Sequence, residues 1–191
     1  MIKGVIFDMD GTVVDVPYDW TRIKSDLEVH GRPILSYLRS LEEPERSRKW
    51  KILEKYEAEA TRQAVLKEGI RELFAFLETK RIKRVLVTNN SRRNVRLLLK
   101  RFHLIFDLVV SRESGLWKPS GAPFLFVLKT LQLEREECCV VGDSRFDVHA
   151  ALEAGIDAVF LLGGTESPDY GPNVVVCRSV AELQEKLEAL T

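Results

Sequence analysis

Short apolar runs alternate with amphipathic segments along most of this chain, and the two patterns predict different elements. Six runs have the length and composition of β-strands, at residues 3–7, 84–88, 108–110, 138–141, 158–161 and 174–177. Four segments carry apolar positions three and four residues apart, as amphipathic helices do, at residues 94–102, 123–131, 146–154 and 180–190. Gly155 follows the third segment and predicts a helix C-cap there. Strands alternating with helices indicate an α/β fold built on a doubly wound parallel sheet.

A helical insertion interrupts this alternation after the first strand. The stretch from residue 15 to 67 shows no strand pattern and is rich in Glu, Lys, Arg and Leu. Two runs in it have helical spacing, and Pro44 separates them: Leu35, Leu38 and Leu41, then Trp50, Leu53 and Tyr56. We therefore predict a core of residues 1–14 and 68–191, with a small helical insertion at residues 15–67.

Charge and composition disfavour several classes of partner. The chain has 191 residues, of which 45% are hydrophobic, and 29 basic residues balance 29 acidic ones. No overall field would gather nucleic acid or an anionic membrane, so neither is expected as a partner. No run reaches the roughly 18 apolar residues that a membrane span needs, and no charged leader precedes the first strand. We expect a soluble, cytoplasmic monomer or homodimer whose cysteines are buried, reduced thiols: Cys138, Cys139 and Cys177.

Pairs of carboxylates follow the first and fourth predicted strands of the core. Asp8 and Asp10 end the first strand in the segment DMDGT, and Asp143 and Asp147 follow the strand at residues 138–141. In an open parallel sheet, ligands bind at the carboxyl ends of the strands. Hard oxygen ligands gathered there suit Mg²⁺, which takes one or two carboxylates, waters and phosphate oxygens. Considered singly, each pair also fits a turn or a helix cap.

Two further segments carry groups that bind anions. Thr88 and Asn89 end the second core strand ahead of a predicted helix, whose first backbone N–H groups can hold a phosphate. Lys118 and Pro119 lie in the loop before the helix at residues 123–131. Thr88 by itself is more readily interpreted as a helix cap, and a loop lysine is usually solvated. Pro119 restricts the backbone, which suggests that the ammonium of Lys118 is aimed at a site.

In chain order, these four segments resemble the four motifs of the haloacid dehalogenase-like superfamily: DxDGT, the Thr88 strand end, the Lys118 loop and GDSxxD at residues 142–147. The helical insertion resembles the cap of the subgroup that includes phosphoglycolate phosphatases and β-phosphoglucomutases. The resemblance implies a Rossmann-like core, with the insertion acting as a lid over Asp8.

The same resemblance implies a role for each motif residue. Asp8 would be the nucleophile, and Asp10 the general acid and then the general base. Mg²⁺ would be held by Asp8, the backbone carbonyl of Asp10 and Asp143, with Asp147 acting directly or through water. Phosphoryl oxygens would be bound by Thr88, the Asn89 amide and Lys118. Trp20 and Arg22 in the insertion are candidate contacts for the rest of the substrate.

The activity that this resemblance implies is a Mg²⁺-dependent phosphatase that hydrolyses a small phosphorylated metabolite through an aspartyl-phosphate. A sugar-phosphate mutase shares these motifs and stays open, as does a non-catalytic module that binds a phospho-ligand. Carbon–halogen hydrolysis is disfavoured because the dehalogenase branch has no acid at the position of Asp10. A phospho-receiver module is disfavoured by motif order, because its phosphorylated aspartate follows its acidic pair, whereas Asp8 precedes Asp143 and Asp147.

Overall fold

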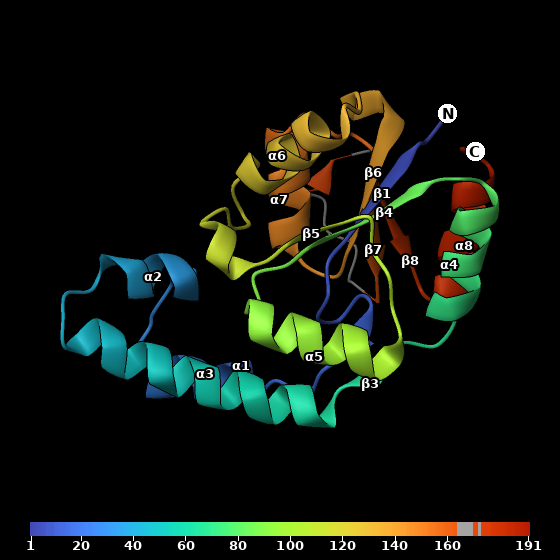
Figure 1. Ribbon diagram of the computed structural model, residues 1–191. Coiled ribbons are helices and arrows are strands. Elements are labelled where there is room, and N and C mark those ends of the chain that lie inside the picture. The colour runs from blue at the N-terminus through green and yellow to red at the C-terminus, as the bar shows by residue number, and fades with distance from the viewer. Residues whose placement is uncertain (164–169, 172) are drawn as a thin grey trace. The chain divides into compact units, whose positions relative to one another are not determined.

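Within the described residues (1–163, 170, 171 and 173–191), a parallel sheet of six strands forms the centre of the computed structural model (Figure 1). The strands are β1 (Gly4–Phe7), β4 (Lys83–Val87), β5 (Leu108–Val110), β6 (Cys138–Gly142), β7 (Val159–Leu162) and β8 (Val174–Cys177). They lie in the order β5-β4-β1-β6-β7-β8. The chain therefore builds the sheet outward from β1 in one direction and then in the other, which confirms the predicted doubly wound α/β class.

Helices cover both faces of this sheet (Figure 1). On one face α6 (Ala122–Leu131) and α7 (Arg145–Glu153) pack together, and on the other α4 (Ile70–Thr79) packs against α8 (Val180–Glu188). Successive side chains of β1 point to opposite faces of the sheet. Ile6 lies in the core cluster with Phe124 of α6 and Val148 of α7, whereas the ring of Phe7 lies 5.4 Å from that of Phe74 on α4. α5 (Arg92–Phe102) connects β4 to β5.

The register of the three central strands determines which loops meet. β1 pairs with β4 on one side and with β6 on the other, in parallel along its whole length. The pairing continues past the end of β1, because Asp8 N donates to Val141 O at 2.9 Å. Residues that follow β1, β4 and β6 therefore meet at one edge of the sheet, at the point where the direction of chain winding reverses.

The predicted elements differ from the observed ones mostly by one or two residues at their ends, and Gly155 has the positive φ of +74° that suits a residue just past a helix C-cap. A few differences are larger. α4 was not predicted, although its buried residues have helical spacing: Ile70, Leu73, Phe74 and Leu77. The expectation of no strand between residues 15 and 67 was wrong at β3 (Val65–Leu66), which pairs antiparallel with β2 (Val14–Asp15). These two-residue strands lack a local pattern and exist only because they pair.

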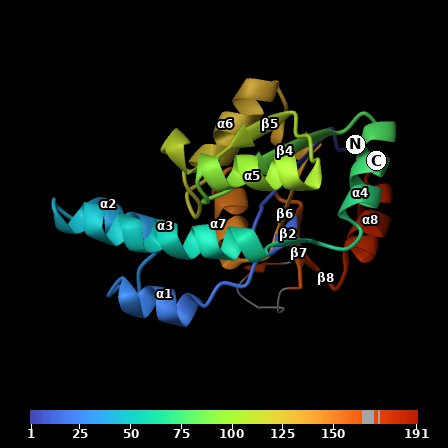
Figure 2. The same ribbon diagram turned by 60° about the horizontal axis from the view of Figure 1, so that its bottom comes forward.

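The chain divides into two compact units, Met1–Asp15 with Val65–Thr191, and Val16–Ala64. The second unit contains α1 (Trp20–Asp26), α2 (Ile34–Ser40) and α3 (Glu45–Gln63). α2 and α3 contain the two predicted helical runs, whereas α1 was not predicted. Figures 1 and 2 show α3 as the longest helix of this unit, and it packs against both α1 and α2.

A buried lysine ties these three helices together. Lys49 on α3 is 1% exposed, and its Nζ donates to Leu27 O at 2.7 Å, just past α1, and to the hydroxyl of Tyr37 on α2 at 2.8 Å. The carboxylate of Glu28 accepts from the same Nζ at 2.8 Å. The ammonium donates three hydrogen bonds, so its burial is compensated.

In the part of the chain that is described, no helix has both the length and the apolar character needed to cross a membrane. The three cysteines are buried free thiols, as predicted: Cys138, Cys139 and Cys177.

Replacing Lys49 by methionine should destabilise the Val16–Ala64 unit. Methionine fills similar space but leaves Leu27 O and Tyr37 without their donor, which should cost on the order of 1–3 kcal/mol in the free energy of unfolding. Urea denaturation followed by tryptophan fluorescence would measure the loss. The matched control is Lys51→Met, since Lys51 is exposed on the same helix and its replacement should stay within about 0.5 kcal/mol. Equal midpoints for the two variants would contradict the role given to Lys49.

Candidate active site

Three carboxylates converge at the carboxyl edge of the central strands. Asp8 follows β1, Asp143 follows β6, and Asp147 lies in the first turn of α7. One carboxylate oxygen from each lies within 4.8 Å of the other two. The cap of α7 fixes the third of them, because Ser144 N and Oγ donate to Asp147 Oδ2 at 3.1 and 2.8 Å. The residues that start the helix therefore also orient an acid in the site.

Lys118 places its ammonium among these acids. Its Nζ lies 2.7 Å from Asp8 Oδ1 and 2.6 Å from Asp147 Oδ1, and its side chain is 4% exposed. Burial disfavours the charge, but the ion pairs with Asp147 and Asp8 outweigh it and hold the pKa of Lys118 above its usual value. The lysine is therefore a fixed positive charge beside Asp8.

One ammonium does not balance three carboxylates. Burial raises the pKa of Asp8 to about 6, with Lys118 lowering it and Asp147 adding to the rise. Burial also raises the pKa of Asp143 to about 7, and the charges of Asp8 and Asp147 add to that rise. Both carboxyls therefore hold protons more tightly than usual, chiefly because burial disfavours their charged form.

Two glycines allow the acids to approach the backbone. Gly11 has φ +80°, and a Cβ there would lie 2.0 Å from Oδ2 of Asp143. A Cβ at Gly142 would lie 2.3 Å from Cγ of Asp147. Any side chain at either position would displace an acid of the cluster, so the glycines in DMDGT and GDSRFD are steric requirements of this site.

The donor set fits a hard divalent cation. The converging ligands are carboxylate oxygens with a deficit of positive charge, which is the chemistry that Mg²⁺ takes in proteins. Asp147 differs from the other two acids, because both of its oxygens already accept hydrogen bonds, from Lys118 and from Ser144. Asp8 and Asp143 are therefore better placed than Asp147 to offer an oxygen directly.

Asn89 holds the Lys118 loop through its side chain. Its Nδ2 donates to Lys118 O at 2.8 Å, and its Oδ1 accepts from Lys118 N at 3.0 Å. Arg112 Nε in turn donates to Asn89 O at 2.9 Å, and Trp117 Nε1 donates to Arg112 O at 2.7 Å. The side-chain amide of Asn89 is thus engaged with the lysine loop, and its backbone N–H is the group suited to a phosphate. Neither Arg112, which lies two residues after β5, nor Trp117 was among the predicted site residues.

Thr88 and Asp10 belong to a second set of contacts at the same edge. Thr88 is buried, and its Oγ1 accepts from Asn90 N at 3.1 Å. The side chain of Asn90 crosses to the first motif, where its Nδ2 donates to Asp10 Oδ2 at 2.9 Å. Sequence reasoning also missed Asn90, although its place beside Thr88 and Asn89 at the end of β4 was a usable signal.

Trp20 and Arg22 lie on α1 in the Val16–Ala64 unit. Trp20 is 46% exposed, and its ring centroid lies 4.5 Å from that of Tyr18. The backbone N–H of Arg22 donates to the capping carboxylate of Asp19 at 2.9 Å. The structure therefore places both residues at the start of the first helix of this unit, and their contacts with a substrate stay a prediction.

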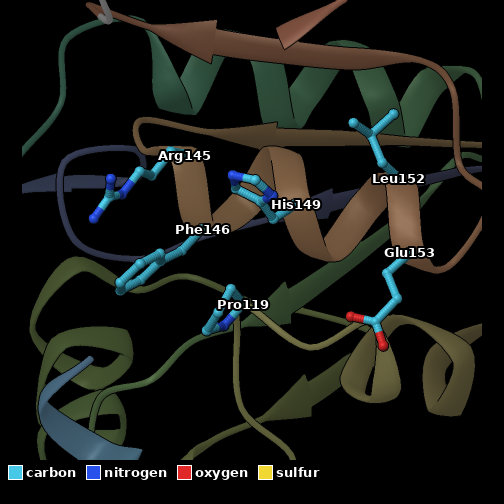
Figure 3. Close-up of a pocket in the computed structure, with 6 residues that line it drawn as sticks. All are labelled: Pro119, Arg145, Phe146, His149, Leu152 and Glu153. Carbon is cyan, nitrogen blue, oxygen red and sulfur yellow. The ribbon is translucent and has the colours of Figure 1, made fainter. Parts of the chain in front are cut away.

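An open hollow lies beside α7 and the lysine loop (Figure 3). Its lining consists of Pro119, which follows Lys118, and five residues of the helix: Arg145, Phe146, His149, Leu152 and Glu153. Glu153 accepts from the backbone N–H of Gly121 at 2.9 Å and so ties the far end of α7 to the same loop. This hollow contains none of the converging acids, which lie at the carboxyl edge of the sheet.

Several known proteins are similar to this chain in sequence or in fold. A haloacid dehalogenase-like hydrolase domain-containing protein of Arabidopsis thaliana is 30% identical over 186 residues, which are 90% of this chain and 74% of that protein. A phosphoglycolate phosphatase of Chromobacterium violaceum is 28% identical, covering 98% of this chain and 97% of the relative. The crystal structure of a hydrolase from Pseudomonas syringae has the same fold, with a TM-score of 0.79, 20% identity and 99% coverage of both chains.

The sequence model of the haloacid dehalogenase-like hydrolase family matches residues 17–161. This range contains the Thr88 strand end, the Lys118 loop and the acids of the GDSRFD segment. Asp8 and Asp10 precede it, and they join the other motifs through the pairing of β1 with β4 and β6. From the match and the shared fold, this chain belongs to the haloacid dehalogenase-like hydrolase family.

Proposed function

We propose that this protein is a Mg²⁺-dependent phosphatase that hydrolyses a small phosphorylated metabolite through an aspartyl-phosphate on Asp8. One observation carries the proposal: the Asp8 carboxylate, 13% exposed, lies 2.7 Å from the buried ammonium of Lys118 and beside Asp143 and Asp147. A negative nucleophile can approach a phosphate dianion only where positive charge is concentrated. The name of the phosphoglycolate phosphatase relative, which this chain matches over nearly its full length, supports the same class of substrate.

In the first half-reaction, an Asp8 carboxylate oxygen attacks phosphorus. The new O–P bond forms as the bond from phosphorus to the ester oxygen breaks, and Asp10 gives its proton to the departing oxygen. In the second, Asp10 takes a proton from a water that attacks the same phosphorus, which releases inorganic phosphate and restores Asp8. Lys118, the hydroxyl of Thr88 and the backbone N–H of Asn89 would bind the phosphoryl oxygens.

Mg²⁺ would be held by Asp8, the backbone carbonyl of Asp10 and Asp143. Asp147 would reach it through water, because its oxygens accept from Lys118 and Ser144. When bound, the ion offsets the negative charge that the carboxylates and the phosphate bring together.

Trapping of the phosphoenzyme tests the mechanism. With 4-nitrophenyl phosphate, Asp10→Asn should release a burst of nitrophenol and then turn over slowly. Nitrophenolate leaves without a general acid, so phospho-Asp8 still forms, but its hydrolysis is slow because no general base activates the water. We expect steady turnover to fall on the order of 10²- to 10⁴-fold. Mass spectrometry should find one added phosphoryl group on Asp8. Asp8→Asn should show neither the burst nor the adduct, and phosphate release by that variant at the wild-type rate would exclude the covalent mechanism.

Magnesium binding should strengthen as pH rises. Because the pKa values of Asp8 and Asp143 are raised to about 6 and about 7 in the metal-free protein, protons compete with the cation below these values. For the same reason, these two carboxyls take up protons when the metal-free protein folds, so their contribution to its stability should fall as pH rises from about 4 through 7. Thermal unfolding with and without Mg²⁺ at pH 5.5, 6.5 and 7.5 would measure both trends. Asp143→Asn should flatten them, and stabilisation by Mg²⁺ that was independent of pH in the wild type would contradict this assignment.

The Val16–Ala64 unit should govern substrate choice rather than the chemical step, since a lid contacts the part of the substrate that does not react. Trp20→Ala and Arg22→Ala should change kcat/KM among phosphorylated metabolites by roughly 10-fold or more, and change the rate on 4-nitrophenyl phosphate by less than about 3-fold. A panel of phosphate esters assayed for released phosphate would show this. Equal losses on every ester would assign these residues to the stability of the unit instead.

A further inference from the structure

Two buried asparagines at the start of α5 form a short chain of hydrogen bonds that ends on Asp10. Asn94 and Asn90 are 4% and 3% exposed. Asn94 Nδ2 donates to Asn90 Oδ1 at 3.0 Å, and Asn90 Nδ2 donates to Asp10 Oδ2 at 2.9 Å. The contact between Asn90 and Asp10 could not be predicted from the sequence, because these residues are 80 positions apart.

The orientation of the Asn90 amide follows from its neighbours. The oxygen and nitrogen of an amide are told apart by their hydrogen-bond partners. Two donors reach the same atom of Asn90, the backbone N–H of Ser91 at 2.7 Å and Nδ2 of Asn94 at 3.0 Å. That atom must be the oxygen, so the other terminal atom is the nitrogen and presents a donor to Asp10.

The start of α5 fixes Asn94 in turn. Ser91 is the N-cap, and its Oγ accepts from the backbone N–H of Asn94 at 3.3 Å. Asn94 is therefore held by its backbone to the cap while its side chain points back to Asn90. Leaving either buried amide without partners would cost free energy, so the two side chains stabilise one common arrangement.

We propose that Asn94 and Asn90 are positioning residues that hold the Asp10 carboxyl in one orientation for proton exchange with the substrate. This inference rests on the proposed function. The side-chain amide of Asn90 donates to Oδ2 of Asp10 and so fixes one oxygen of that carboxyl. With Oδ2 held, the carboxyl cannot rotate freely, and the acid meets the ester oxygen in one orientation. Asn94 acts through Asn90, to which its side chain donates.

The dependence of rate on the leaving group tests this role. Asn94→Asp keeps the size of the side chain, but its carboxylate accepts and cannot donate to Asn90 Oδ1, so the Asn90 amide loses one of the two donors that orient it. Asn94→Ala removes the group altogether and serves as the second variant. The rate of phospho-Asp8 formation would be measured by rapid quench in single turnovers, with 4-nitrophenyl phosphate and with an alkyl phosphate.

We expect Asn94→Asp to slow phospho-Asp8 formation from the alkyl phosphate by roughly 10- to 100-fold, a part of the effect of losing a general acid. The rate with 4-nitrophenyl phosphate should change by less than about 3-fold, because nitrophenolate departs without a proton. Loss of folded protein would lower both rates equally. The matched control is Asn173→Ala, since Asn173 is exposed, and it should leave both rates unchanged.

A combination with Asp10→Asn completes the test. If Asn94 acts only through Asp10, Asn94→Asp should add nothing further to the alkyl phosphate rate of the Asp10→Asn variant. Equal slowing of both esters by Asn94→Asp, or full additivity with Asp10→Asn, would overturn the inference and leave the proposed function intact. Absence of phospho-Asp8 in the wild type would overturn the proposed function itself.

Discussion

Repulsion among three carboxylates is the constraint on which this site depends. Asp8, Asp143 and Asp147 bring oxygens within 4.8 Å of one another at the end of an apolar sheet, where water screens their charge poorly. Lys118 forms ion pairs with two of them and relieves part of the repulsion, while burial and, after it, the neighbouring carboxylates raise the pKa values of Asp8 and Asp143. The excess of negative charge attracts a cation, and a bound cation is in turn what lets an anionic ester approach Asp8.

The parallel sheet makes this concentration of charge possible. Since β4, β1 and β6 are neighbours, three loops open at one edge, and each side chain starts from a strand end that the core holds rigid. Gly11 and Gly142 then remove the atoms that would keep the acids apart from the backbone. The same packing holds the lysine loop, because Asn89 engages both backbone groups of Lys118. Stability of the core and geometry of the site therefore depend on the same strands.

The first turns of two helices serve both structure and chemistry. At α7, the capping serine orients Asp147 and so determines where the second ion pair of Lys118 forms. At α5, the cap residue Ser91 holds Asn94, which leads through Asn90 to Asp10. One helical turn can therefore both cap its helix and position side chains in the site, because its backbone groups and its side chains form hydrogen bonds with different partners.

The sequence by itself determined the class of the fold. Apolar residues recur every two positions in a strand and every three or four in a helix, so the local pattern shows which face of each element is buried. It also pointed to the acids, since carboxylates at the ends of apolar strands stand out without knowledge of their neighbours, and to Lys118 through its place in the order of the four motifs. Only the tertiary structure decided the pairing of β2 with β3, the engagement of the Asn89 side chain with Lys118, and the contact of Asn90 with Asp10. These depend on strand register and on side-chain orientation, which are fixed when distant segments pack together and leave no periodic trace in the chain.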